Sequence, residues 1–375
     1  MRKVLIVFGT RPEAIKMAPV VKEFQQEKSH FDVRVCVTAQ HREMLDQVLS
    51  FFDIRPEYDL NLMKPSQNLY SLTADIVVSL KSIFEEFKPD FVFVHGDTTT
   101  SMASALAAFY CGAKVCHVEA GLRTFNKWAP FPEEMNRQLT GRLTDIHFAP
   151  TEQSKQNLLN EGVKGDRIVV TGNTVIDALL HSVQKVQGLT DHTGINAVKK
   201  ILQADKEMIL VTGHRRENFG EGFLNICEGL RIIAENFDGD IVYPVHLNPN
   251  VQKPVFEMLR DIPNVKLIDP QPYEVFVWLM SVAKIIITDS GGVQEEAPSL
   301  GKPVLVMRDT TERPEAIKAG TVILVGTNKE KIVNEALCLL TDRDKYKMMS
   351  QLHNPYGDGK ASQRIIAFMK SFNLT

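Results

Sequence analysis

The sequence predicts an α/β protein built from two Rossmann-like domains, each a doubly wound parallel sheet. Short apolar runs rich in β-branched residues alternate with longer amphipathic patterns along nearly all of the 375 residues. Several runs are apolar on both faces, which is typical of parallel strands covered by helices. The pattern also restarts near residue 175, and a length of about 150 residues per domain favours at least two domains. We therefore expect right-handed βαβ units in both halves.

The expected elements follow this alternation. In the first half the strands are expected at residues 4–8, 33–38, 91–95, 114–119, 147–149 and 168–171, with helices at 13–26, 42–52, 72–87 and 100–110. In the second half the strands are expected at 208–212, 241–244, 265–268, 285–288, 304–306 and 322–325, with helices such as 222–235 and 329–340. One more amphipathic helix is expected at 360–372. This gives an N-terminal domain over residues 1–170, a C-terminal domain over 171–359 and a hinge near 171–175.

The composition excludes several classes of function. Lys and Arg total 43 and Asp and Glu total 46, so the net charge is −3 and no global field gathers nucleic acid or anionic membrane. No apolar run reaches the ~18 to 20 residues that span a bilayer. The five cysteines lie beside apolar residues without a Cys-x-x-Cys pair, which is typical of reduced thiols in the cytoplasm. The ten histidines are scattered without zinc-ligand spacing, so we expect no metal site.

Ligands of open α/β sheets bind at the carboxyl ends of the strands, so the residues that follow each strand are the candidates for ligand contacts. After the first strand, Gly9-Thr10-Arg11-Pro12-Glu13 leads into a helix, with Lys16 one turn further. A glycine and a helix N-terminus favour an anion, and Arg11 and Lys16 add positive charge. The alternative is an ordinary turn with a solvated Arg11. The chain has no Gly-x-Gly-x-x-Gly, the usual fingerprint of a dinucleotide site.

Three carboxylates follow the next strands of the first half. Asp97 comes after the strand at 91–95, Glu119 ends the strand at 114–119, and Glu133 follows Pro132 at a helix start. A carboxylate at the end of an apolar strand is costly unless it is paired or functional. The alternatives are a helix N-cap for Asp97, a salt bridge from Glu119 to Arg123, and an ordinary acidic first turn for Glu133.

The second half presents two polar segments after strands. His214 lies in Gly213-His214-Arg215-Arg216, a set that suits a phosphate or a leaving group, although a structural histidine is the alternative. The segment Ser290-Gly291-Gly292 opens a helix after the strand at 285–288, where Ser290 can cap the helix and the free N–H groups can hold a diphosphate. Glu296, one turn beyond Gly292, can accept both hydroxyls of a ribose. Arg313 adds a basic group after the following strand. A helix cap with a solvated Glu296 is the alternative.

Six motifs in order closely resemble the bacterial non-hydrolysing UDP-N-acetylglucosamine (UDP-GlcNAc) 2-epimerases over essentially the whole chain. The matching segments are residues 8–14, 94–98, 118–123, 132–134, 213–218 and 289–296. The resemblance implies the GT-B architecture, with a cleft between two Rossmann-like domains and a C-terminal helix, residues 360–375, that returns to the first domain. It also implies reversible conversion of UDP-GlcNAc to UDP-N-acetylmannosamine (UDP-ManNAc) for bacterial cell-surface polysaccharides, by a homodimer without a redox cofactor.

The family's site residues carry over onto matching positions. The resemblance implies catalytic roles for Asp97, Glu119, Glu133 and His214. It implies UDP-sugar contacts for Arg11, Lys16, Gln271, Phe276, Ser290, Gly291, Gly292, Glu296 and Arg313, together with Asp97, Glu119 and His214. Many members also bind a second UDP-GlcNAc as an activator, and the matching positions are Gln40, Glu43, Arg215 and His246.

The chemistry accounts for so many acidic groups. No carbonyl lies beside C2 of the sugar, so its hydrogen is not acidic until the C1–O bond to UDP breaks. Loss of the C2 proton then gives 2-acetamidoglucal, and a proton delivered to the other face followed by return of UDP completes the epimerisation. We expect Asp97, Glu119 and Glu133 to share the proton transfers and His214 to stabilise departing UDP. The competing hypotheses are a GT-B glycosyltransferase and a non-catalytic nucleotide-sugar sensor.

Overall fold

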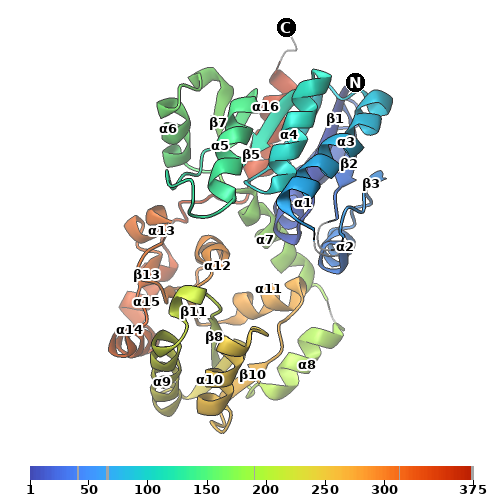
Figure 1. Cartoon of the computed structure of the whole chain (residues 1–375). Helices are drawn as coiled ribbons and strands as arrows, with labels where there is room; N and C mark the ends of the chain where they lie inside the picture. Colours follow the sequence, from blue (N-terminus) through green and yellow to red (C-terminus); the bar gives the residue numbers. More distant parts are fainter. Residues whose placement is uncertain (40–41, 65–66, 190, 312, 373–375) are drawn as a thin grey trace. The chain divides into compact units, whose positions relative to one another are not determined.

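The computed structural model describes residues 1–39, 42–64, 67–189, 191–311 and 313–372 (Figure 1). The chain forms two compact units, the first from residues 1–178 and 356–375 and the second from residues 179–355. Each unit holds a single all-parallel sheet, which confirms the expected fold class. Across the described ranges, no helix is both long enough and apolar enough to pass through a bilayer.

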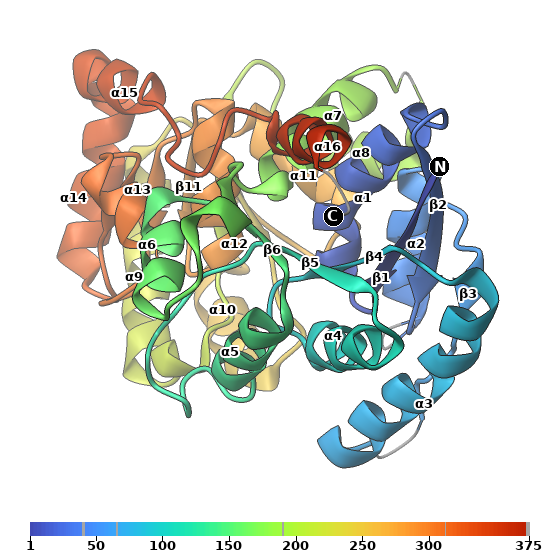
Figure 2. The ribbon, with the colours of Figure 1, turned by 90° about the horizontal axis from the view of Figure 1, so that it is seen from above.

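The first unit is a seven-stranded sheet with the order β3-β2-β1-β4-β5-β6-β7. Its strands are β1 (Arg2–Phe8), β2 (Phe31–Val37), β3 (Tyr58–Asp59), β4 (Phe91–His95), β5 (Lys114–Val118), β6 (Ile146–Ala149) and β7 (Ile168–Val170). Its helices are α1 (Arg11–Gln26), α2 (Arg42–Phe51), α3 (Leu69–Phe87), α4 (Thr99–Cys111), α5 (Glu133–Leu143), α6 (Glu152–Asn160), the short η1 (Gly165–Arg167) and α16 (Ala361–Ser371). Figure 2 shows α1 and α16 on one face of this sheet and α3, α4 and α5 on the other.

The second unit is a six-stranded sheet with the order β10-β9-β8-β11-β12-β13. Its strands are β8 (Glu207–Thr212), β9 (Gly239–Pro244), β10 (Val265–Ile268), β11 (Ile285–Thr288), β12 (Val304–Val306) and β13 (Val322–Leu324). Its helices are α8 (Thr193–Ile201), η2 (Arg216–Asn218), α9 (Glu221–Asn236), α10 (Pro249–Leu259), α11 (Tyr273–Val282), α12 (Gly291–Glu296), η3 (Ala297–Leu300), α13 (Pro314–Lys318), α14 (Lys329–Thr341) and α15 (Arg343–Ser350). Helix α7 (Thr174–Gln187) begins in the first unit and ends in the second.

Every expected strand is present, and each overlaps its expected range. Strand β3 was not expected, because two residues at a sheet edge leave no alternating pattern to read. The unit boundaries also differ from the expected ones. The chain leaves the first unit after Ala178 rather than near residue 170, and returns at Tyr356 rather than at 360. The reason is that hydrogen bonds join the start of α7 to the segment after Pro355. For example, the backbone amide of Asn173 donates to the Tyr356 carbonyl at 2.7 Å.

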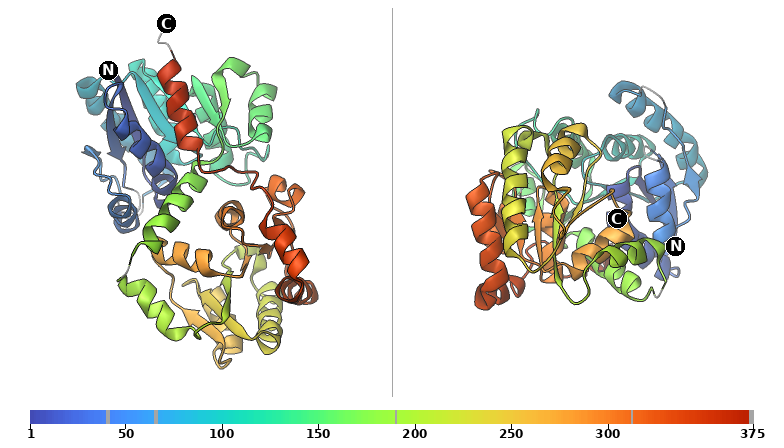
Figure 3. Two further views of the ribbon diagram at one scale, coloured as in Figure 1. Left: turned by 180° about the vertical axis from the view of Figure 1, so that it is seen from behind. Right: turned by 90° about the horizontal axis from the view of Figure 1, so that it is seen from below.

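Helix α16 is held in the first unit at both ends. Its N-terminal N–H groups lack a side-chain cap of their own, and Asp177 of α7 accepts from the amides of Ala361 (3.1 Å) and Ser362 (2.7 Å) instead. At the other end the Arg2 guanidinium donates to the Phe372 carbonyl at 2.8 Å. Between them Phe368 packs edge-on against Phe148 of β6, with ring centroids 5.8 Å apart. Figure 3 shows the helix lying beside α1.

We predict that Asp177→Ala loosens α16. The substitution leaves two N-terminal amides of a buried helix end without their acceptor, at a cost of about 2–3 kcal/mol. Hydrogen exchange of the α16 amides measures this as a lower free energy of opening. Asp358→Ala is the control, because its exposed carboxylate pairs with Arg364 and accepts from the Lys360 amide at 3.2 Å, contacts whose loss in solvent costs below about 1 kcal/mol. Equal effects of the two substitutions would contradict the role given to Asp177.

Candidate functional site

Each sheet has one point where the strand order reverses, and doubly wound folds bind ligands there. In the first unit this point lies between β1 and β4, and in the second between β8 and β11. The segments carrying Arg11 and Asp97 follow β1 and β4, and the segments carrying His214 and Ser290 follow β8 and β11. Within each unit, these expected site residues therefore follow the carboxyl ends of the two strands between which the topology predicts a ligand.

The turn after β1 requires a glycine and holds a buried carboxylate. A Cβ on Gly9 would lie 2.0 Å from Thr38 Oγ1 and 2.7 Å from Thr100 Oγ1, so no side chain fits. Glu13, 2% exposed, accepts from the amides of Gly9 (3.0 Å) and Thr10 (2.8 Å) through one oxygen. Its other oxygen accepts from the hydroxyls of Thr98 (2.6 Å) and Ser101 (3.0 Å). Burial raises the pKa of Glu13. Glu13 thus ties the turn after β1 to the turn after β4 and places Arg11 and Asp97 on a fixed frame.

Glu119 directly follows β5 and has a left-handed backbone conformation, with φ of 62°. Its side chain pairs with Lys16 of α1, accepts from the side-chain amide of Asn173 at 2.8 Å and lies 3.8 Å from His95 Nε2. Burial opposes its ionisation, but Lys16 and His95 outweigh burial and lower the pKa of Glu119 to about 2. The sequence-based alternative of a salt bridge to Arg123 is wrong, since Arg123 binds Glu161 through two hydrogen bonds of 2.6 and 2.9 Å.

Asp97 lies next to Glu119 across the strand ends. Oε1 of Glu119 lies 3.5 Å from where a Cβ on Gly96 would be, immediately before Asp97. Arg137 of α5 pairs with the Asp97 carboxylate, and the Asn136 side chain donates to its backbone carbonyl at 3.0 Å. The alternative role of helix N-cap is wrong, because Thr98 caps α4 by accepting from the Ser101 amide. Asp97 is therefore available at the strand end, held by α5.

Two adjacent glutamates begin α5 and have different surroundings. Glu134 is completely buried and accepts from the backbone amides of Thr124 (3.0 Å) and Phe125 (3.1 Å), so it fastens the preceding loop. Glu133 is half-buried and makes no hydrogen bond or ion pair with any residue that the structure describes. Its helix is the one that holds Asp97. Of Asp97, Glu119 and Glu133, it is therefore Glu133 whose side chain holds no other described residue in place.

Three buried histidines lie behind these carboxylates and were not singled out from the sequence. His95, His117 and His147 stand on the neighbouring strands β4, β5 and β6, and His117 is paired in register with His147. His117 Nε2 lies 2.7 Å from the Gly96 carbonyl, which braces the turn before Asp97. Burial lowers the pKa of His95 to about 4, and those of His117 and His147 to about 3. Their positions inside apolar strand patterns are the sequence signal that could have indicated buried histidines.

We predict that this trio makes the first unit acid-labile. Below about pH 6.5 the unfolded chain binds protons on these histidines while the folded unit does not, so the free energy of unfolding falls with pH down to about pH 4 for His95 and about pH 3 for His117 and His147. Each histidine contributes up to about 1.4 kcal/mol per pH unit within that window. Denaturant unfolding at several pH values measures the slope, and His147→Gln should reduce it. His353→Gln, at an exposed position, should leave it unchanged, and an unchanged slope in both would contradict the assignment.

In the second unit the strand ends bring His214 against a buried aspartate. Asp289 is fully buried and accepts from the backbone amides of His214 and Arg215, both at 2.8 Å. Its Oδ1 lies 3.4 Å from His214 Nδ1. The His246 ring stacks on the His214 ring with centroids 5.4 Å apart. Burial lowers the pKa of His214, Asp289 opposes that shift, and His246 and Arg215 add to it.

The start of α12 and Arg313 form a second group in this unit. Ser290 is the N-cap residue, but its side chain makes no capping hydrogen bond, contrary to the expectation. The Arg313 guanidinium lies over Gly291, where a Cβ would come within 2.8 Å of its Cζ, and it also binds Glu295 at 2.8 Å. Glu296 Oε1 folds back to 3.3 Å from the Cβ position of Gly292. A ligand at Gly291 and Gly292 would therefore meet backbone amides, a guanidinium and a carboxylate.

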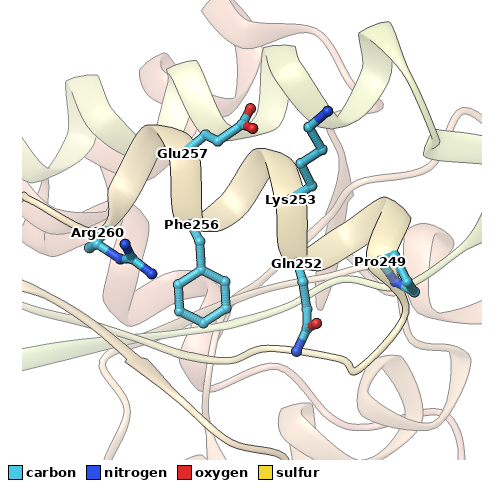
Figure 4. A pocket seen from close by; sticks show the side chains of 6 residues that line it. All are labelled: Pro249, Gln252, Lys253, Phe256, Glu257 and Arg260. Carbon is cyan, nitrogen blue, oxygen red and sulfur yellow. The ribbon is translucent and has the colours of Figure 1, made fainter.

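The remaining expected residues contact the groups described above less directly. Gln271, after β10, donates to the Asp269 carbonyl at 2.7 Å, and Phe276 lies half-buried in α11. Of the positions for an activator, Arg215 and His246 lie beside His214, Glu43 is exposed in α2, and Gln40 lies outside the described residues. A hollow of about 390 Å³ on α10, lined by residues such as Phe256 and Arg260, contains no expected site residue (Figure 4). No cluster of His, Cys, Asp and Glu suited to a metal occurs among the described residues.

A family model described as UDP-N-acetylglucosamine 2-epimerase matches residues 22–370. The chain belongs to the UDP-N-acetylglucosamine 2-epimerase family. It is therefore an isomerase, as the resemblance implied. The *Escherichia coli* K12 protein named UDP-N-acetylglucosamine 2-epimerase is 60% identical over 375 residues, which is all of both chains.

Two solved structures of family members agree with this assignment. The *Neisseria meningitidis* UDP-GlcNAc 2-epimerase bound to UDP-GlcNAc is 54% identical, covers 98% of this chain and 99% of its own, and gives a TM-score of 0.88. The *Methanocaldococcus jannaschii* UDP-GlcNAc 2-epimerase in complex with UDP-GlcNAc and UDP is 35% identical, covers 99% and 100%, and gives a TM-score of 0.80. These matches confirm the fold class expected for a UDP-GlcNAc 2-epimerase.

Proposed function

We propose that the protein interconverts UDP-GlcNAc and UDP-ManNAc by elimination of UDP and its re-addition. The main support is Glu119, a carboxylate held ionised by Lys16 at a strand end, in a chain of this family. An ionised carboxylate can take a proton from C2 once the C1–O bond breaks. The product supplies N-acetylmannosamine for cell-surface polysaccharide. The elimination is anti, and the return of UDP to 2-acetamidoglucal is syn.

The first unit supplies the acid–base groups in this proposal. Epimerisation needs proton transfer on both faces of C2, so one carboxylate is not enough. Glu119 and Asp97 are paired with Lys16 and Arg137, whereas Glu133 has no ion pair with a described residue. This difference favours Glu119 as the base on one face of C2 and leaves Glu133 as the candidate for proton transfer on the other face. Arg11 and Lys16 add positive charge beside the sugar phosphate.

The second unit supplies the UDP contacts. The amides of Gly291 and Gly292 and the Arg313 guanidinium suit the diphosphate, and Glu296 suits the ribose hydroxyls. Ser290, Gln271 and Phe276 complete the nucleotide contacts. His214 stabilises the charge that develops on UDP as the C1–O bond breaks.

One experiment separates this function from its rivals. Purified protein is mixed with UDP-GlcNAc in deuterated water and followed by NMR. Deuterium at C2 together with a UDP-ManNAc signal identifies the epimerase. Release of UDP only after addition of a sugar acceptor would identify a glycosyltransferase, and tight binding without any change would identify a sensor.

A second UDP-GlcNAc acting as activator is part of the proposal. Arg215 and His246 lie beside His214 and support it from the second unit, while Glu43 is the described position in the first. Sigmoidal dependence of rate on UDP-GlcNAc supports activation. Conversion of UDP-ManNAc at full rate without added UDP-GlcNAc would exclude it.

We also propose that the protein is a homodimer joined through α3 and α4. These helices border a hollow of about 570 Å³, and Val78 and Tyr110 beside it are 72% and 68% exposed. Exposed apolar surface of this kind favours a protein partner. Val78→Glu is therefore expected to give a monomer by light scattering, while Leu224→Glu, at an exposed apolar position of α9, leaves the mass unchanged. A dimeric Val78→Glu variant would exclude this interface.

A further inference from the structure

Asp289 has a buried carboxylate oxygen that lacks a donor. Its Oδ2 is well satisfied, because it accepts from the amides of His214 and Arg215. Its Oδ1 has no hydrogen-bond partner among the described residues, and the aspartate is completely buried. His214 Nδ1 lies 3.4 Å from it, beyond an ordinary hydrogen bond but close enough for a small rotation of the ring to make one. A buried carboxylate oxygen without a hydrogen-bond donor requires an explanation, and the nearby His214 ring provides one.

This contact would fix the tautomer of His214. If Nδ1 carries the proton that faces Asp289, then Nε2 of the neutral ring is unprotonated and free to bind a proton. The His214 side chain is 44% exposed, so the ring remains accessible on the side away from the buried carboxylate. A proton taken up there would make an imidazolium whose Nε2–H can donate to an oxyanion.

We propose that Asp289 is a positioning residue that holds His214 with its proton on Nδ1 and stabilises the imidazolium that faces departing UDP. The proposal rests on the function proposed above. As the C1–O bond breaks, its electron pair passes to the β-phosphate oxygen, which accepts a hydrogen bond from Nε2–H. The proton stays on His214, and the same contact serves the return of UDP.

The charges around His214 support this role. The groups that face it are Asp289 after β11, His246 after β9 and Arg215 of its own loop. Burial, His246 and Arg215 all disfavour an imidazolium, so Asp289 is the one group of this set that favours it. Asp289 also directly precedes Ser290 and Gly291, where its negative charge would oppose a diphosphate. An imidazolium at His214 would neutralise that charge.

The test is the tautomer of neutral His214, measured by ¹⁵N NMR on the full chain with ¹⁵N-labelled histidine, without nucleotide and at a pH high enough for the ring to be neutral. His214→Asn assigns the signal. The proposal expects protonated Nδ1 and unprotonated Nε2 in the neutral ring, and a change to protonated Nε2 in Asp289→Asn. That variant should also lower kcat by about 10²-fold or more, with a smaller effect on UDP affinity and a lower pH for the His214-dependent limb of the rate profile. Asn218→Ala is the matched control, since Asn218 donates to the same carboxylate and to the Met307 carbonyl and should leave the tautomer unchanged.

The outcomes separate the two proposals. Unprotonated Nδ1 in wild-type neutral His214 overturns the role of Asp289 even if the Asp289 variant does not fold. A wild-type kcat in Asp289→Asn, with His214→Asn inactive, also overturns it and leaves the proposed function standing. A fully active His214→Asn would instead contradict the role that the proposed function gives to His214.

Discussion

Glu119→Gln is expected to reduce kcat by roughly 10²- to 10⁴-fold, the range of a lost general acid or base. The amide keeps the size of the side chain and can still accept from Asn173, but it cannot take the proton from C2. It also removes the negative charge of the ion pair between Glu119 and Lys16. Steady-state kinetics together with exchange of the C2 hydrogen in deuterated water measure the loss, and both should fall together.

A carboxylate of the same sheet serves as the control for Glu119. Asp145 accepts from the Val115 amide at 2.9 Å, near the opposite end of β5. Asp145→Asn can keep that hydrogen bond and should retain the wild-type kcat. A Glu119→Gln variant with wild-type kcat would remove Glu119 from the proton transfers.

Glu133→Gln is the second substitution expected to have a large effect, and its neighbour provides a contrast. Glu133→Gln should lower kcat by roughly 10²- to 10⁴-fold, because the amide side chain cannot transfer the proton. It should not change the melting temperature, because the Glu133 side chain has no partner among the described residues. Glu134→Gln should do the reverse, because its carboxylate holds the amides of Thr124 and Phe125 and each lost bond costs about 1–3 kcal/mol.

Kinetics and thermal melting of both variants test this contrast. We expect the loss of activity at position 133 and the loss of stability at position 134. An active Glu133→Gln enzyme, or equal melting temperatures for the Glu134→Gln variant and the wild type, would contradict it.

The fold could be predicted largely because buried parallel strands are continuous apolar runs that end abruptly. That rule located the strands in both units and the polar residues that follow them. It could not predict β3, because two residues carry no hydrophobic pattern. It also could not predict where α7 passes between the units, which depends on the hydrogen bond between Asn173 and Tyr356. Tertiary hydrogen bonds between distant residues set that boundary.

The site was predictable in its residue types but not in its partners. The carboxylate of Glu119 was found from its position after a strand, whereas its partner Lys16 is 103 residues away and no local spacing joins them. Asp289 also follows an apolar strand, so the same signal could have marked it as a functional residue. Glu13 and His117 act by holding turns, and only the folded chain shows which backbone groups they meet.

The central claim is that the C1–O bond to UDP breaks during epimerisation, and labelled substrate tests it most directly. UDP-GlcNAc carrying ¹⁸O in the bridge between C1 and the β-phosphorus is incubated with the protein, and ³¹P NMR follows the position of the label. If that bond breaks, the label should spread into the non-bridging β-phosphate oxygens as UDP-ManNAc forms. UDP-ManNAc that forms with all of its ¹⁸O still in the bridge would contradict it.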